Sequence, residues 1–99
     1  VEKLAAELKG SPRNHKVRLE LARASQEVQD WDNALNHYEK LITTRKSLPA
    51  VIEDLQILNR QGVTPARVRQ LLGDAYVQEG QLDEALEMYR LARQALMRS

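Results

Sequence analysis

The sequence contains no cysteine and no phenylalanine. The absence of cysteine excludes disulfide bonds, thiol catalysis, zinc held by cysteine and iron–sulfur clusters. Glycine and proline are scarce, with four and three residues, which argues against an all-β fold rich in tight turns. Aromatic residues make up only 4% of the 99 residues. A core must therefore be built from leucine, isoleucine, valine and alanine.

An excess of charge of one sign is also missing. The sequence has 15 basic and 14 acidic residues, a net charge of +1. Such a balance creates no long-range field that would attract nucleic acid or an anionic membrane. No apolar run approaches the ~20 residues of a transmembrane helix, and no signal-peptide pattern opens the chain. Because the chain begins at Val1, we expect a piece of a longer protein. Its compartment is unknown, with the cytoplasm as the default expectation.

The residues that could support catalysis are not arranged for it. His15 and His37 are isolated from each other and from any recognisable partner motif. Asp83 and Glu84 are adjacent, so in a helix their side chains point in different directions and cannot act together on one bond. No P-loop, dinucleotide-binding or zinc-protease motif occurs. We therefore predict that the protein is not an enzyme and uses no cofactor or metal.

An internal repeat appears when the sequence is shifted against itself by 51 residues. Residues 17–42 then align with residues 68–93, and eight of the 26 pairs are identical. The identical pairs lie mainly at small and apolar positions, which indicates one structural unit used twice. They are Val17/Val68, Arg18/Arg69, Leu21/Leu72, Ala24/Ala75, Asp32/Asp83, Ala34/Ala85, Leu35/Leu86 and Tyr38/Tyr89.

The apolar spacing within each unit is that of amphipathic helices. In the second unit, apolar residues recur at i, i+3, i+4, i+7 and i+8 from Val68 onward, stop at Gly80 and resume at Leu82. This pattern predicts two helices joined by a short turn. Along the whole chain we predict no strand and helices at 2–9, 14–28, 32–46, 49–61, 65–79 and 82–97.

These residues resemble a known family. The run Leu72-Gly73-x-x-Tyr76, followed by Gly80, Leu82, Ala85, Tyr89 and Ala92, is similar to the tetratricopeptide repeat (TPR), a 34-residue helix–turn–helix. The earlier unit departs from the pattern because Ser25 replaces the tyrosine and Gln29 the glycine. Both units carry an arginine, Arg18 or Arg69, near the place of the family's large aromatic residue.

The resemblance implies an all-α fold, a right-handed TPR-like α-solenoid fragment built of antiparallel helix hairpins. The 51-residue offset exceeds one repeat by half a repeat, so we expect an extra helix that Pro49 begins and Gly62 ends, with Thr64 as the N-cap of the next helix. We predict a single domain over 1–99: the tail of a preceding repeat at 1–12, the first repeat at 15–48, the extra helix at 49–62 and the second repeat at 65–98.

Small residues should set the distance between the helices of each hairpin. Gly73 and Ala85 allow the two backbones of the second hairpin to approach closely, and Ala34 does so in the first. A larger side chain at Ala85 would overpack the helix crossing. We therefore expect Ala34 and Ala85 to be buried at tight contacts.

The family resemblance implies a protein-interaction scaffold that binds a peptide or a partner subunit on its concave face. Helical phase places eight candidates on that face: Lys16, Leu19, Arg23, Gln26, Arg67, Gln70, Asp74 and Val77. One TPR class clamps a C-terminal carboxylate with lysine and asparagine at such positions. Here Leu19 with Arg23, and Gln70 with Asp74, do not form that clamp, so the partner stays unidentified.

Two alternatives remain open. One is a structural spacer or oligomerisation segment without a groove ligand. The other is a helical-repeat nucleic-acid binder, for which the arginine clusters around Arg18 and Arg69 would form a basic stripe. The near-neutral net charge and the scarcity of aromatic residues favour solvated, paired arginines instead. We predict no binding to nucleic acid or to membranes.

The two ends of the chain lack capping helices in this interpretation. The first helix would expose Val1, Leu4, Ala5 and Leu8, and the last would expose Leu86, Tyr89, Leu96 and Met97. Uncovered apolar patches drive association. Further repeats of a longer protein would cover these faces, or the isolated fragment would form a two-fold homodimer.

Overall fold

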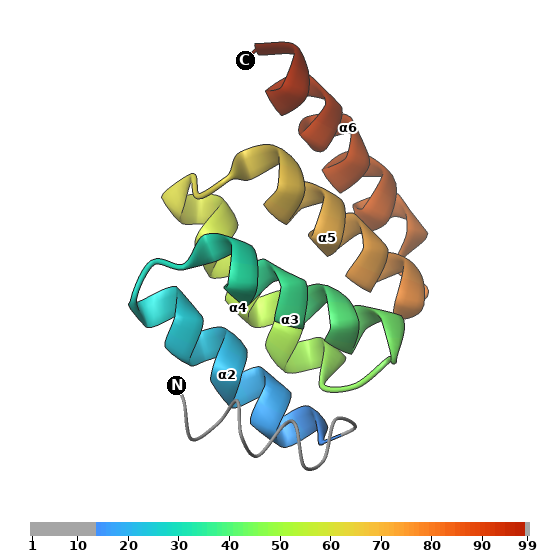
Figure 1. Ribbon diagram of the computed structural model, residues 1–99. Coiled ribbons are helices and arrows are strands. Elements are labelled where there is room, and N and C mark those ends of the chain that lie inside the picture. The colour runs from blue at the N-terminus through green and yellow to red at the C-terminus, as the bar shows by residue number, and fades with distance from the viewer. Residues whose placement is uncertain (1–13, 99) are drawn as a thin grey trace. The chain divides into compact units, whose positions relative to one another are not determined.

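The computed structural model describes residues 14–98 (Figure 1). Five α-helices and no strand occur among these residues, which confirms the all-α, helical-repeat fold class. The chain divides into two compact units, one ending at Ser47 and the other beginning at Leu48. The helix expected at 2–9 and the repeat tail at 1–12, with its apolar residues, lie outside the described residues.

The first unit is a hairpin of α2 (His15–Glu27) and α3 (Trp31–Thr43). Asn14 caps α2, because its side-chain oxygen accepts hydrogen bonds from two backbone N–H groups of the first turn at 3.1 and 3.2 Å. Asp30 caps α3 in the same way, and Trp31, the one tryptophan of the sequence, is the half-buried first residue of that helix. Both helices therefore begin where a side-chain acceptor satisfies an otherwise unpaired amide.

Each helix of the first unit buries one apolar stripe. The predicted close-contact residue Ala34 is completely buried, as are Leu35 and Tyr38. Burial of each large apolar side chain contributes about 1.5–3 kcal/mol to the stability of the fold, so these buried side chains are the main stabilisation of the hairpin. The buried residues of α2 and α3 are Val17, Leu21, Ala22, Ser25, Ala34, Leu35, Tyr38, Leu41 and Ile42.

The second unit contains α4 (Leu48–Gln61), α5 (Pro65–Gln78) and α6 (Leu82–Arg98). Helix α5 packs against both α4 and α6 (Figure 1). The predicted extra helix is therefore present as α4, and it is packed on α5. Ala85 is buried in α6, as its small size led us to expect.

The loop between α4 and α5 leads into α5 without a side-chain cap. Gly62 follows α4 with a φ of 73°, and Pro65 is the first residue of α5, both as predicted. Thr64 stands at the N-cap position, but its side chain makes no capping hydrogen bond. Its backbone is left-handed, with φ 33° and ψ 63°, whereas an N-cap side chain reaches the first-turn amides from extended backbone. Thr64 is therefore the N-cap residue of α5 as predicted, but its side chain does not cap the helix.

The turns inside the two hairpins use the same backbone conformation with different residues. Gly80 has a φ of 77°, and its counterpart 51 residues earlier, Gln29, has a φ of 61°. Left-handed backbone suits glycine and is strained for a residue with a Cβ atom. The first hairpin therefore tolerates at Gln29 a conformation that the second adopts without steric cost.

We expect Gln29→Gly to raise the free energy of unfolding by about 1 kcal/mol, because glycine relieves this strain. Urea denaturation followed by circular dichroism measures the change. Gly80→Gln is the matched reverse substitution and should lower the free energy of unfolding by a similar amount. Equal stability of Gln29→Gly and the wild type would contradict the proposed strain.

Candidate functional site

The eight predicted groove residues lie in two stripes, one along α2 and one along α5, the first helices of the two hairpins. We call Lys16, Leu19, Arg23 and Gln26 the α2 stripe, and Arg67, Gln70, Asp74 and Val77 the α5 stripe. Four of these side chains are exposed and four are half-buried. The exposed ones are Lys16, Arg23, Gln70 and Val77, and the half-buried ones are Leu19, Gln26, Arg67 and Asp74.

One member of each stripe is held by a tyrosine of the second helix of its own hairpin. The Tyr38 hydroxyl donates a hydrogen bond to Gln26 Oε1 at 3.0 Å. The Tyr89 hydroxyl donates one to Asp74 Oδ1 at 2.5 Å. Helical phase predicted that Gln26 and Asp74 lie with the groove residues, but it does not predict their hydrogen bonds to the tyrosines. One acceptor oxygen of each of these two side chains is therefore already engaged within its own hairpin.

The two tyrosines occupy equivalent positions but reach different partners. Gly73 lies under the Tyr89 ring, because a Cβ atom placed on it would stand 2.5 Å from Tyr89 Cε1. The equivalent residue of the first hairpin is Ala22, which does have a Cβ atom. There Tyr38 bonds to Gln26, about one helical turn beyond the position that corresponds to Asp74. The partners differ because the residue equivalent to Asp74 is Arg23, which has no acceptor, and the residue equivalent to Gln26 is Val77, which has no polar side-chain atom.

The environment of Tyr89 favours its neutral phenol. Partial burial and the hydrogen bond to the Asp74 carboxylate raise the pKa of Tyr89 to about 12 from an ordinary value of 10.0. The raised pKa stabilises the fold fully below pH 10, and this contribution is lost as the pH rises through 12. Tyr89, which we had expected to be uncovered at the chain end, is in fact half-buried against α5.

Arginines take the place of the family's large aromatic residue and connect helices. Arg69 Nε donates to Asn59 Oδ1 of α4 at 3.0 Å, and its Nη1 donates to the Leu91 carbonyl of α6 at 3.3 Å. Arg18 Nη1 lies 3.2 Å from His37 Nδ1 of α3. Sequence reasoning placed both arginines in basic clusters, although their position at the aromatic site of the repeat could have indicated a packing role. They bind neighbouring helices within their own units.

The surroundings of His37 favour its neutral imidazole. Burial, and secondarily the positive charge of Arg18, lower the pKa of His37 from its ordinary value of 6.5. The neutral imidazole can accept the guanidinium hydrogen bond at Nδ1, whereas the protonated ring cannot. The first hairpin therefore favours the neutral form of His37.

We expect the free energy of unfolding to fall as the pH drops below 6.5, because the unfolded chain binds a proton at His37 before the folded chain does. The stabilisation is present above 6.5 and disappears as the pH passes down through the lowered pKa. Urea denaturation at pH 7.5 and at lower pH values measures this loss, and His37→Gln should make it smaller. An identical pH dependence in the variant and the wild type would contradict the assignment.

A second feature of the second unit is an open hollow of about 300 Å³ at the start of α6. Its lining residues are Tyr76, Asp83, Glu84, Glu87 and Met88. The Tyr76 hydroxyl accepts a hydrogen bond from Gln56 Nε2 at 2.7 Å, which attaches this wall of the hollow to α4. Glu87 forms an ion pair with Arg90 at 2.6 Å. The hollow combines an apolar wall with carboxylates, and sequence reasoning noted only the adjacent acids.

None of the helices described by the structure is long and apolar enough to cross a membrane. Within residues 14–98, no three histidine, aspartate or glutamate side chains are grouped so that they could hold a metal ion.

Comparison with known proteins gives one family. The family model described as tetratricopeptide repeat matches residues 18–50 and 69–96, which together make up more than half of the chain. A search of curated proteins and a search of solved structures found no match. The two matched stretches contain most of the α2–α3 hairpin and most of the α5–α6 hairpin. With five helices among residues 14–98 and two matched stretches, the chain belongs to the tetratricopeptide repeat family.

Proposed function

We propose that this chain is a protein-interaction module that binds a peptide or a partner subunit through the α2 stripe and the α5 stripe. TPR repeats are generally protein–protein interaction modules, and they are typically non-enzymatic scaffolds. The finer proposal concerns which surface binds and which chemistry the partner has.

The observation that carries the proposal is the composition of the two stripes. The α2 stripe carries two cationic side chains, Lys16 and Arg23, and no carboxylate, whereas the α5 stripe carries Arg67 and Asp74. The Asp74 carboxylate already accepts the Tyr89 hydroxyl. Apolar surface is available beside these charges, since Val77 is exposed. The cations of the α2 stripe favour acidic residues in a partner, and the exposed Val77 of the α5 stripe favours an apolar one.

Selection from a random peptide library displayed on phage tests the proposal. We expect enrichment of peptides with acidic residues and an apolar residue. Arg23→Ala and Arg67→Ala should each weaken binding of the selected peptides about tenfold, which corresponds to about 1.4 kcal/mol. Arg60→Ala, which removes an exposed arginine of α4, is the matched control and should leave binding unchanged.

Three outcomes would contradict the proposal. Selected peptides could bind the stripe variants as tightly as the wild type. Single-stranded RNA could bind at submicromolar concentration with a steep salt dependence, which would identify a nucleic-acid binder instead. Self-association that is insensitive to stripe variants, without any selected peptide, would support the spacer or oligomerisation alternative.

A further inference from the structure

The open hollow at the start of α6 is a feature of the second unit that the peptide-binding stripes do not use. Its volume of about 300 Å³ lies at the lower end of small-molecule pockets, so it has room for one side chain of a partner and not for a large ligand. Helix α5 supplies one wall through Tyr76, and α6, which packs beside α5 (Figure 1), supplies the rest. The four lining residues of α6, at i, i+1, i+4 and i+5, lie on one side of that helix. They are Asp83, Glu84, Glu87 and Met88.

The apolar walls of the hollow are an aromatic ring and a thioether. Tyr76 and Met88 are both half-buried, so part of each side chain stays accessible. The Tyr76 hydroxyl accepts a hydrogen bond from Gln56 Nε2 of α4 at 2.7 Å, which holds the ring in place before a ligand binds. Such a ring loses little entropy on binding, and its face attracts a cation. These walls suit the apolar stem of a cationic side chain.

The hollow is negatively charged. Glu87 forms an ion pair with Arg90, whereas Asp83 and Glu84 form no ion pair with any residue among 14–98. The helix dipole favours acidic residues in the first turn, which contains Asp83 and Glu84. It does not account for Glu87, which lies one turn further along the helix. Three carboxylates therefore line the hollow, and one cation pairs with them.

The first repeat indicates that the hairpin does not need these residues. Its only acidic counterpart of a lining residue is Asp32. The position of Tyr76 is taken by Ser25, which is buried and provides no aromatic wall. The combination of a ring, a thioether and three carboxylates thus belongs to the second repeat alone, as expected of a binding site and not of the shared framework. The counterparts of the lining residues, 51 residues earlier, are Ser25, Asp32, Asn33, Asn36 and His37.

The arrangement of the carboxylates favours an organic cation over a metal ion. Within residues 14–98, no three acidic or histidine side chains are grouped so that they could hold a metal ion. The carboxylates of the hollow are instead distributed around an apolar surface. A matching ligand needs a cationic end for the carboxylates and an apolar stem for the walls. Arginine has both, since its guanidinium stacks on aromatic rings and donates two hydrogen bonds to a carboxylate.

We propose that the hollow receives an arginine side chain of a partner protein. The guanidinium lies against the Tyr76 ring and donates to Asp83 and Glu84, and the stem lies on Met88. The site uses no residue of the α2 stripe or the α5 stripe, so the proposal goes beyond the peptide-binding function and does not depend on it. The contacts are open to solvent and individually weak, so we expect a dissociation constant on the order of millimolar for a single blocked arginine.

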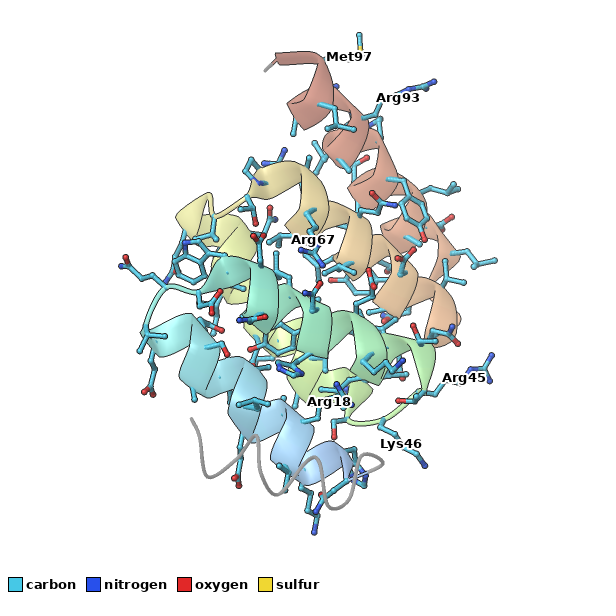
Figure 2. All side chains as sticks on the ribbon, in the orientation of Figure 1. Arg18, Arg45, Lys46, Arg67, Arg93 and Met97 are labelled. Atoms are coloured by element: carbon cyan, nitrogen blue, oxygen red, sulfur yellow. The ribbon has the colours of Figure 1, made fainter. Side chains whose placement is uncertain are left out.

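The methionine methyl groups report binding directly. Of the two methionines, Met88 lines the hollow, whereas Met97 is 79% exposed and lies roughly 13 Å further along α6 (Figure 2). In ¹³C-methyl NMR of the complete chain, N-acetyl-arginine amide should shift the Met88 signal until it saturates and leave Met97 unchanged. N-acetyl-citrulline amide has the same shape without the charge and should not shift Met88. Equal shifts at both methionines, or equal shifts with the citrulline compound, would overturn the proposal.

Two variants test the two kinds of wall in the same titration. Glu84→Gln and Tyr76→Leu should each weaken binding of N-acetyl-arginine amide at least about threefold, because one removes a charge and the other the aromatic face. Glu39→Gln, which removes an exposed carboxylate of the first unit, is the matched control and should leave binding unchanged. Circular dichroism checks that the variants keep the helical fold. Glu84→Gln keeps the apolar walls intact, so unchanged affinity in that variant overturns the proposal whether or not Tyr76→Leu folds.

Discussion

Replacing Tyr38 by alanine is expected to lower the free energy of unfolding by about 4 kcal/mol. Tyr38 is the largest completely buried side chain described, and truncation of a buried aromatic residue leaves a cavity that the surrounding helices cannot fill. The variant also removes the hydroxyl from which Gln26 Oε1 accepts a hydrogen bond. Chemical denaturation of the variant and the wild type, followed by circular dichroism, measures the difference.

Tyr38→Phe separates the two contributions. It keeps the ring and removes only the hydroxyl that bonds to Gln26, so we expect a loss of about 1 kcal/mol. A Tyr38→Ala variant no less stable than Tyr38→Phe would mean that the ring contributes nothing to the core. That result would contradict the packing of α2 on α3 described above.

Replacing Gly73 by leucine is expected to lower the free energy of unfolding by about 3 kcal/mol. The Cβ atom alone would lie within 3 Å of three atoms of the Tyr89 ring, so the ring must leave its place and release Asp74. Overpacking of this kind costs about 1–3 kcal/mol, and the lost hydrogen bond adds about 1 kcal/mol. The better helix propensity of leucine offsets about 1 kcal/mol of the total.

A double variant tests the cause of this loss. Gly73→Leu combined with Tyr89→Ala removes the ring that the leucine would strike, so the two destabilisations should not add. We expect the double variant to be at least about 1 kcal/mol more stable than the sum of the single variants implies. Full additivity would show that Gly73 and Tyr89 act independently, against the close contact between them.

Much of the fold could be predicted because helical periodicity and local signals are visible in the sequence. The extra helix was expected from the apolar face between Pro49 and Gly62, and α4 spans Leu48–Gln61. The burial of Ala34 and Ala85 followed from their small size and their place in the repeat, and the structure confirms it. These features depend on residues within one helix or its caps, which the sequence displays directly.

The remaining features depend on contacts between helices, which periodicity alone does not reveal. The packing of the Tyr89 ring on Gly73 and the hydrogen bond of Tyr38 to Gln26 could not be read from helical phase. The left-handed backbone at Thr64 likewise came from the geometry of the α4–α5 connection. For the candidate site, four of the eight residues chosen by helical phase are exposed, and the role of both stripes in binding stays a prediction.

The position of Trp31 makes the coupling between the two units measurable. Trp31 is the single tryptophan and begins α3, so its fluorescence reports unfolding of the first unit. Circular dichroism, by contrast, reports the helices of both units. If the units unfold as one cooperative body, the two signals give the same transition in urea. A difference between the two midpoints would show that one unit can unfold while the other stays folded. The measurement needs no attached dye, because Trp31 is part of the native sequence.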